Sequence, residues 1–230
     1  ATNPAEAFAK FQMSNELQGG SYDAKAMSVL IAAQKKASFD GSDLSSKPAG
    51  NIPNFAFIVG LPRSGTTLIN SMLACHPEIE SIGESTCLIA ARKLAQNLMS
   101  ISSPELDNWS WTQDVPLSIL EQARQRFLSG IHLPPGAKPK LVIDKMPGNR
   151  FELGFARMML PNARSIYMLR HPLDVGLSLF TTNLKDGYEY SRRLEWIAHM
   201  IRATYDSLDD FRGKLGSRLR LQSYRALVSD

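Results

Sequence analysis

The sequence has 230 residues, of which 43% are hydrophobic, and this suits one well-packed globular domain. The 26 Lys and Arg against 22 Asp and Glu give a net charge of +4, which favours an anionic small molecule but is too small and scattered to indicate nucleic acid. No apolar run approaches the ~20 residues of a membrane span, and no signal peptide is visible. Cys75 and Cys87 lack metal-ligand spacing, which favours reduced thiols and a cytoplasmic location, with a single disulfide as the alternative.

Residues 1–50 differ in pattern from the rest of the chain. Apolar residues recur at helical spacing on both sides of Gly19-Gly20, which predicts two helices that form a hairpin. We interpret them as a helical N-terminal appendage that packs on the domain, with the stub of a helical repeat array as the alternative. Residues 39–53 are rich in Gly, Ser, Asp and Pro and are predicted to be a linker or surface loop. The main domain is expected at 51–230.

From Phe55 onward, short apolar runs alternate with helical patterns. The expected strands are 55–59, 80–82, 140–143, 165–169 and 219–222. The expected helices are 66–75, 87–99, 117–128, 150–160, one that begins at Pro172, 190–211 and one that begins at Tyr224. This alternation predicts an α/β fold with a parallel sheet flanked by helices and with ligands at the carboxyl ends of the strands. Gly60, Asp144 and Arg170 each follow an expected strand, so we expect them to share one composite site.

The most informative stretch is the loop from Gly60 to Thr67, between the first strand and its helix. A glycine-rich turn from strand to helix directs backbone N–H groups and the positive end of the helix dipole at an anion. The spacing matches the nucleotide-binding P-loop, except that Thr66 occupies the lysine position and the positive charge has moved to Arg63. The loop is therefore expected to bind a different phosphate-like group, with less reliance on a metal. The residues of the following helix predicted to face the core are Leu68, Ile69, Met72 and Leu73.

Three segments together resemble the sulfotransferases that use 3′-phosphoadenosine 5′-phosphosulfate (PAPS). Residues 62–68, Pro-Arg-Ser-Gly-Thr-Thr-Leu, resemble their 5′-phosphosulfate loop, and residues 170–178 resemble their 3′-phosphate site. Residues 144–149, Asp-Lys-Met-Pro-Gly-Asn, are similar to a segment of the tyrosylprotein and bacterial branch. The resemblance covers roughly 54–228. It implies a P-loop-like sulfotransferase fold that moves a sulfonyl group from PAPS to a hydroxyl or phenol and leaves adenosine 3′,5′-bisphosphate, with no metal.

The resemblance also implies roles for individual residues in holding the donor. The residues assigned to the 5′-phosphosulfate are Arg63, Ser64, Gly65, Thr66 and Thr67. Arg170 and Ser178 are assigned to the 3′-phosphate, with a salt-bridged arginine and an ordinary helix serine as the alternative. Tyr224 is assigned to the adenine, with structural packing as the alternative. Asp174 is expected to fix its turn or cap its helix.

Two further residues are assigned to catalysis beside Arg63. Lys145 is implied to stabilise charge on the transferring group, and a surface lysine is the alternative. Glu84 is the proposed base that withdraws the acceptor proton, because its distance along the chain from Arg63 matches that in the tyrosylprotein enzymes. Its alternative is a glutamate at a helix N-terminus, where the dipole favours it. Of the four histidines, His132 and His199 have no evident partner residues, and His76 and His171 are interpreted as a helix-end residue and the neighbour of Arg170.

Other functions and the acceptor remain open at this stage. An ATP-dependent P-loop kinase and a non-catalytic nucleotide-binding domain are the alternative functions. The acceptor is expected to be a hydroxyl or phenol of a small molecule, a carbohydrate or a peptidyl tyrosine. In the tyrosylprotein enzymes, arginines shortly after the catalytic glutamate bind acidic residues around the target tyrosine. Here Arg92 is the one arginine that follows Glu84 in this region, which disfavours recognition of an acidic peptide. Members of the family normally continue past the position of Asp230, so a C-terminal part of the domain is expected to lie outside this sequence.

Overall fold

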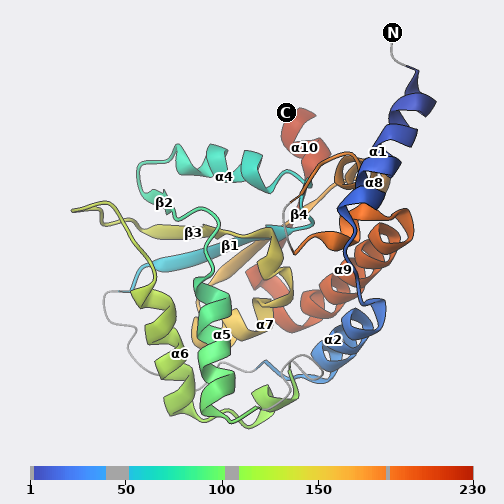
Figure 1. The fold of residues 1–230 in the computed structure, drawn as a ribbon. Coiled ribbons are helices and arrows are strands. Elements are labelled where there is room, and N and C mark those ends of the chain that lie inside the picture. Colours follow the sequence, from blue (N-terminus) through green and yellow to red (C-terminus); the bar gives the residue numbers. More distant parts are fainter. Residues whose placement is uncertain (1–2, 40–51, 102–108, 185–186, 230) are drawn as a thin grey trace.

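A parallel sheet of five strands forms the centre of the molecule (Figure 1). The computed structural model describes residues 3–39, 52–101, 109–184 and 187–229. Within these residues the strands are β1 (Asn54–Gly60), β2 (Ile79–Ser81), β3 (Leu141–Lys145), β4 (Arg164–Leu169) and β5 (Leu219–Ser223). They pair in the order β2-β3-β1-β4-β5, and every pairing is parallel. The predicted α/β fold is therefore confirmed.

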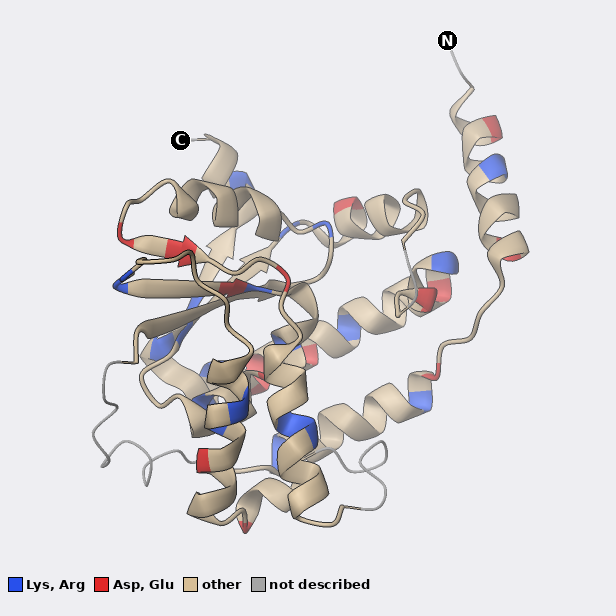
Figure 2. Cartoon of the chain, turned by 60° about the vertical axis from the view of Figure 1, so that its left-hand side comes forward, with Lys and Arg blue, Asp and Glu red and all other residues tan. Residues whose placement is uncertain are grey.

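Helices cover both faces of this sheet. The α-helices are α1 (Pro4–Gln18), α2 (Ala24–Lys36), α4 (Thr66–Ala74), α5 (Cys87–Leu98), α6 (Leu117–Ser129), α7 (Leu153–Met159), α8 (Pro172–Phe180), α9 (Leu194–Leu215) and α10 (Tyr224–Ser229). The short 3-10 helices are η1 (Ser110–Gln113), η2 (Pro147–Phe151), η3 (Glu189–Arg192) and η4 (Gly216–Arg218). None of the described helices has the length and apolar character that crossing a membrane requires. Basic and acidic positions are interspersed along the chain (Figure 2).

The alternation of side chains along β1 explains the two layers. Phe55, Phe57 and Val59 point into the larger core, to which α5, α6, α7 and α9 contribute. Ala56 and Ile58 point to the opposite face, where α4 and α10 lie (Figure 1). Because both faces are covered, β1 reads as a continuous apolar run, as is typical of a central parallel strand.

The face of α4 toward the sheet is narrower than predicted. Ile69 is buried, but Leu68 is 38% and Met72 50% exposed, so the prediction that both face the core is wrong. The helix has only 9 residues and lies above β1, β2 and β3, and one side of so short a helix suffices for this contact. The spacing of apolar residues along a helix does not by itself determine how many of them the packed sheet buries.

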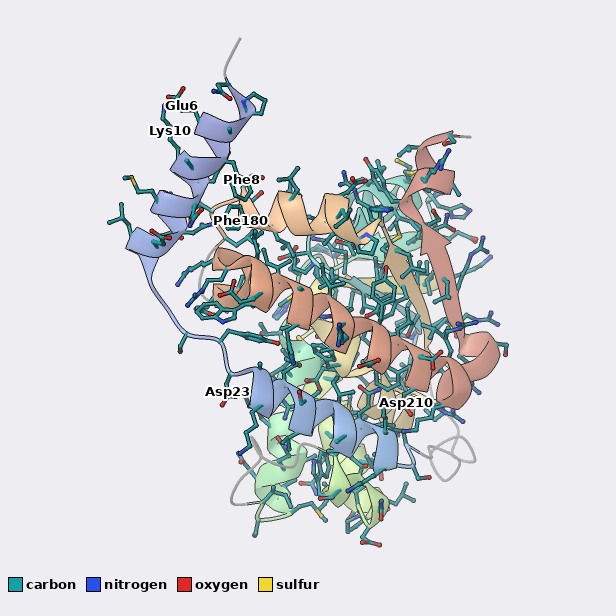
Figure 3. The ribbon with its side chains drawn as sticks, turned by 90° about the vertical axis from the view of Figure 1, so that its right-hand side faces the viewer. Glu6, Phe8, Lys10, Asp23, Phe180 and Asp210 are labelled. Carbon is teal, nitrogen blue, oxygen red and sulfur yellow. The ribbon has the colours of Figure 1, made fainter. Side chains whose placement is uncertain are left out.

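The two N-terminal helices both form, but the predicted hairpin between them is wrong. Helix α1 packs on α8 and η3, where the Phe8 ring stacks on Phe180 with centroids 4.9 Å apart (Figure 3). Helix α2 packs along α9, and the Gln34 side chain donates to Asp210 at 2.8 Å. Each helix thus packs on the main domain, where the Phe8 ring is stacked on Phe180 and the Gln34 side chain is fully buried.

Several boundaries also differ from the predictions. Phe39, at the start of the predicted linker, is buried against Trp109 and Phe211, whereas 40–51 lie outside the described residues. Strand β3 extends two residues further than expected and ends at Lys145. The helix expected at 150–160 is divided into η2 and α7, and the one expected at 190–211 into η3 and α9.

Candidate active site

The loop after β1 has backbone angles that restrict which residues can occupy it. Gly60 has φ of 148°, and a Cβ there would lie 2.8 Å from the carbonyl oxygen of Met168. Gly65 has φ of 100°, and a Cβ there would lie 2.4 Å from Cδ2 of Tyr224. Arg63 has φ of 71°, a left-handed conformation that is uncommon for a residue with a side chain. No side chain caps the start of α4, so its first backbone N–H groups are available to an anion, as the sequence predicts.

The hydroxyl groups of this loop do not all face the same way. Thr67 is exposed, whereas Thr66 is 3% and Ser64 1% exposed. The Ser64 Oγ atom is buried and has no hydrogen-bond partner among the described residues. The Ser64 backbone N–H donates to the carbonyl oxygen of Leu61 at 3.2 Å, which closes the turn. The contacts of Ser64, Thr66 and Thr67 with a sulfonyl donor stay predictions. The Ser64 hydroxyl is directed into the protein in this conformation.

The two predicted donor motifs lie against each other at the ends of β1 and β4. The Arg63 Nε atom donates to the Ser178 Oγ atom at 2.9 Å, and the Arg170 Nη1 atom donates to the Arg63 carbonyl oxygen at 3.1 Å. The Arg170 guanidinium lies 4.7 Å from the centre of the Tyr224 ring. The structure therefore brings Arg63, Arg170, Ser178 and Tyr224 together, although they lie up to 161 positions apart in the sequence. We call them the donor cluster.

The start of α8 differs in detail from the prediction. The His171 Nδ1 atom accepts a hydrogen bond from the backbone N–H of Leu173, so the side-chain cap of α8 is His171. Asp174 lies in the first turn of the helix, and its Oδ2 atom is 3.9 Å from the Arg170 Nε atom, too long for a hydrogen bond. The Asp174 carboxylate therefore interacts favourably with the helix dipole and with the Arg170 charge, but it does not supply the side-chain cap of α8.

Lys145 and Glu84 meet on the other side of β1. Lys145 is the last residue of β3, and its Nζ atom is 2.5 Å from the Glu84 Oε1 atom. The Lys145 side chain is 9% exposed and that of Glu84 54%, so the lysine is fixed and the carboxylate faces solvent. Glu84 lies before α5, which begins at Cys87. The burial of Lys145 disfavours the surface-lysine alternative, whereas the catalytic roles of both residues stay predictions.

Asp144 precedes Lys145 on β3, and the sequence analysis assigned it to the composite site without a role of its own. It is fully buried, and it accepts a hydrogen bond from the Asn149 Nδ2 atom at 3.4 Å. Burial raises the pKa of Asp144 to about 7, against the opposing effects of the Ser85 backbone N–H, Asn149 and Lys145. Asp144 thus contacts the segment that follows Glu84. Its place after an expected strand and at the start of the segment 144–149 was the signal in the sequence.

Tyr188 is a residue that the sequence analysis missed. It is partly buried, and burial together with the negative charge of Glu84 raises its pKa. The phenol therefore stays neutral near the Lys145–Glu84 pair. No motif contains Tyr188, and only the fold brings it close to Glu84.

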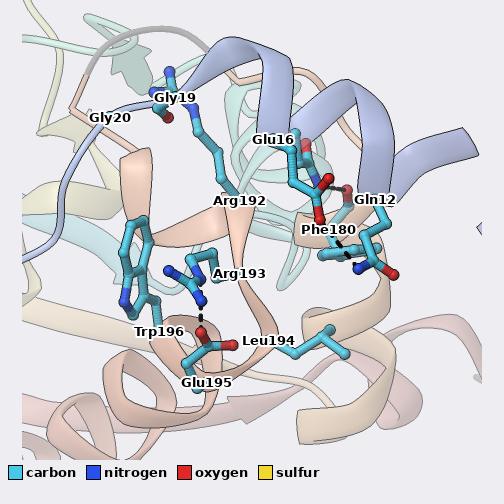
Figure 4. A pocket seen from close by; sticks show the side chains of 11 residues that line it. Gln12, Glu16, Gly19, Gly20, Phe180, Arg192, Arg193, Leu194, Glu195 and Trp196 are labelled. Atoms are coloured by element: carbon cyan, nitrogen blue, oxygen red, sulfur yellow. Dashed lines mark hydrogen bonds and ion pairs between the residues drawn. The ribbon is translucent and has the colours of Figure 1, made fainter. Parts of the chain in front are cut away.

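A separate pocket lies between the end of α1 and the start of α9 (Figure 4). Its volume is about 420 Å³, and it contains none of the predicted site residues. The Arg193 side chain there pairs with Glu195 at 2.6 Å, and the Arg192 Nη1 atom donates to the Gly19 carbonyl oxygen at 2.7 Å. The predicted site residues meet instead at the carboxyl ends of the strands, so we take that place as the candidate active site.

The profile of one protein family, described as the sulfotransferase family, matches residues 54–230. The chain belongs to this sulfotransferase family. The match begins at β1 and includes the donor cluster, Lys145 and Glu84. Within the residues that the structure describes, no three or more His, Cys, Asp or Glu side chains form a group suited to a metal ion.

Comparison with individual proteins agrees with this membership. Protein-tyrosine sulfotransferase 1 of Homo sapiens is 36% identical over 117 residues, which are 50% of this chain and 30% of that protein. The nodulation protein NoeE of Sinorhizobium fredii is 25% identical over 146 residues, 60% of this chain and 33% of that protein. The chain thus spans about a third of the length of these curated relatives.

A solved structure shares the fold. The sulfotransferase domain of the Synechococcus PCC 7002 olefin synthase superposes with a TM-score of 0.50 and 22% identity, over 80% of this chain and 71% of that one. The parallel sheet flanked by helices is therefore the sulfotransferase fold.

Proposed function

We propose that the chain transfers a sulfonyl group from PAPS to a hydroxyl or phenol. The observation that carries this proposal is the contact between the two donor motifs, Arg63 to Ser178 and Arg170 to Arg63. A donor with phosphate groups at both its 5′ and 3′ positions needs two cationic sites at a fixed separation. The guanidinium groups of Arg63 and Arg170, the open N-terminus of α4 and the Tyr224 ring fit such a molecule. PAPS, when bound, supplies the activated sulfonyl group.

The residues on one side of β1 would bind the donor, and those on the other side would act on the reacting groups. Arg63 and the N–H groups of α4 neutralise the 5′-phosphosulfate, and Arg170 with Ser178 holds the 3′-phosphate. Lys145 stabilises charge that develops on the transferring group, and its ion pair orients the Glu84 carboxylate. Glu84 then takes the proton from the acceptor hydroxyl, because an alcohol or phenol is a weak nucleophile until its proton is withdrawn.

We propose a hydroxyl of a small molecule or carbohydrate as the acceptor, ahead of a tyrosine in an acidic peptide. Protein-tyrosine sulfotransferases are among the relatives, which keeps a peptidyl tyrosine as the second candidate. Recognition of an acidic peptide needs free cations beside Glu84, but Arg92 is held in a partly buried ion pair with Glu152 at 2.9 Å. The charge of Arg92 is thus already compensated. Cys75 and Cys87 are free thiols, which supports a cytoplasmic location.

Labelled donors test the proposal against its alternatives. Sulfur label should pass from PAPS to a hydroxyl acceptor, and the reaction should continue in EDTA. Transfer of phosphorus label from ATP would favour a P-loop kinase, and no transfer with either donor would favour a non-catalytic binding domain. Thr66 at the position of the phosphate-binding lysine is the specific observation against the kinase.

Nucleotide binding provides a second readout that needs no acceptor. Adenosine 3′,5′-bisphosphate at ~100 times its Kd should stabilise the fold by about 2.7 kcal/mol, and ADP at the same concentration should stabilise it much less. Thermal melting measures the difference. Equal shifts with the two nucleotides would contradict the 3′-phosphate site.

A further inference from the structure

A small cavity lies beneath the loop that follows β1. Its walls come from that loop, the end of β4, α8 and α9, and among its lining residues are Ser64, Tyr167, Arg170 and Thr204. The space open to the centre of a water molecule is about 10 Å³. This is close to the lower limit for one water molecule, so the cavity is too small for any larger ligand.

Three polar side-chain atoms of the lining residues are buried without a protein partner. They are the Ser64 Oγ, Tyr167 OH and Arg170 Nε atoms, and none bonds to another or to any other described residue. The nearest carboxylate, that of Asp174, is 3.9 Å from the Arg170 Nε atom, which is beyond hydrogen-bond distance. A buried polar group without a partner costs about 1–3 kcal/mol, and all three belong to residues that line the same cavity, which favours a common partner.

The donors and acceptors match what one water molecule can satisfy. The Arg170 Nε–H group only donates, whereas the hydroxyls of Ser64 and Tyr167 can each donate or accept. Burial raises the pKa of Tyr167, so its phenol keeps its proton and remains a donor. A water can accept from Arg170 and Tyr167 and donate to Ser64, which gives it three bonds, the usual number for a buried water.

We propose that an ordered water in this cavity joins Ser64, Tyr167 and Arg170, and that Tyr167 is thereby a positioning residue for the PAPS donor. The functional part rests on the proposed function above. The Arg170 Nη1 atom already donates a hydrogen bond to the Arg63 carbonyl oxygen. Fixing the Nε atom as well leaves the guanidinium a single orientation toward the 3′-phosphate. The same water holds Ser64, so the two donor loops are coupled through the interior of the protein.

The substitution Tyr167→Phe removes one partner of the water and keeps the ring. We expect the Kd for adenosine 3′,5′-bisphosphate, measured by calorimetry, to rise by ~3–10-fold, because a bridging water is worth nearly a direct hydrogen bond. At saturating PAPS the turnover number should change less than twofold, since Tyr167 does not contact the reacting atoms. A Kd equal to that of the wild type would overturn the positioning role.

Tyr190→Phe is the matched control. The Tyr190 hydroxyl is also buried, but it lies near the Arg150 side chain in a different part of the core and does not line this cavity. This variant should keep the wild-type Kd. Equal losses in both variants would overturn the proposal, because they would reflect the general loss of a buried hydroxyl.

A double-mutant cycle tests whether Ser64 and Tyr167 share one partner. If they do, adding Ser64→Ala to Tyr167→Phe should raise the Kd by clearly less than the product of the two single effects. Independent, multiplicative effects would overturn the coupling.

A crystal structure of the unliganded protein at ~1.8 Å tests the water directly. Density within hydrogen-bond distance of all three atoms is expected, and its absence would overturn the proposal. This observation does not depend on PAPS binding. A failure of the labelled-donor assay with the water present would therefore contradict the proposed function, and the reverse result would contradict only the water.

Discussion

The two sides of β1 hold their functional residues in different ways. On the β4 side, the donor cluster is interlocked: Arg63 bonds to Ser178, Arg170 bonds to the Arg63 backbone, and Arg170 stacks on Tyr224. On the β3 side, a single ion pair joins a buried lysine to a half-exposed glutamate. We refer to these as the donor side and the catalytic side.

The difference agrees with what each side would do in the proposed reaction. A group that binds a ligand in one geometry benefits from side chains that restrain one another before the ligand arrives. A base instead has to exchange its partner for the acceptor hydroxyl, so Glu84 needs one firm contact and open access. The following predictions test whether the two sides can be separated experimentally, from the largest expected effect to the smallest.

Glu84→Gln should abolish most of the chemistry and leave donor binding intact. The amide keeps the shape of the carboxylate but cannot take up a proton, so turnover should fall by ~10²–10⁴-fold. The Kd for adenosine 3′,5′-bisphosphate should stay within about twofold of the wild type. Glu78→Gln is the control, because Glu78 also pairs with a lysine, Lys140, at 2.5 Å, but at the amino ends of β2 and β3, away from the carboxyl ends near Glu84 and Lys145. A Glu84→Gln variant with normal turnover that melts earlier would mean that Glu84 is structural.

Lys145→Ala should lower turnover by ~10²–10³-fold, the effect of removing one stabilising donor from a developing charge. Lys145 does not belong to the donor cluster, so the Kd for adenosine 3′,5′-bisphosphate should rise by a much smaller factor than turnover falls. Rapid-quench measurement of a single turnover separates the chemical step from product release. If the variant differed only in melting temperature, Lys145 would have no catalytic role. Lys140→Ala provides the matched control on the exposed pair.

Arg170→Ala should affect binding and leave the catalytic side intact. Hydrogen bonds between charged groups contribute about 1.5–3 kcal/mol, so the affinity for adenosine 3′,5′-bisphosphate should fall by ~10–100-fold. The affinity for ADP, which has no 3′-phosphate, should change little. Calorimetry with both nucleotides checks the difference. Arg164→Ala, an exposed arginine at the opposite end of the same strand, should bind both as the wild type does. An equal loss for ADP would show that Arg170 does not distinguish the 3′-phosphate.

The smallest expected effect is on the pH dependence of the free energy of unfolding, and it comes from the Asp144 carboxyl group. Folding raises the pKa of this carboxyl group from 3.8 to about 7, so between these values the folded state binds a proton that the unfolded state does not. The free energy of unfolding should therefore fall as the pH rises from about 4 to about 7, and the contribution of Asp144 should be lost above that.

Asp144→Asn should reduce this pH dependence, since an amide does not titrate. The melting temperature of the wild type should drop by several degrees more than that of the variant between pH 5 and pH 8, on the order of 2–4 °C for each 1 kcal/mol. The buried Glu152 also has a raised pKa and remains in both proteins, so only the difference between them reports on Asp144. Parallel curves would mean that Asp144 is ionised throughout this range.

Local pattern alone determined much of this protein. The apolar run 55–59, the glycines at 60 and 65 and the helical period after Thr66 predicted the strand, loop and helix that the structure contains. Their physical cause is local: side-chain alternation, the conformational freedom of glycine and the open N–H groups at a helix start act within a few residues. The order of the three motifs also identified the family before the fold was known.

Only the tertiary structure decided which distant groups meet. The hydrogen bond from Arg63 to Ser178 joins residues 115 positions apart, and the ion pair from Lys145 to Glu84 spans 61. The strand order sets both, since β4 and β3 flank β1 on opposite sides. The same long-range packing turned α1 and α2 away from each other and the Ser64 hydroxyl inward. Burial and pKa depend on every neighbour of a group, and no local sequence window contains those neighbours.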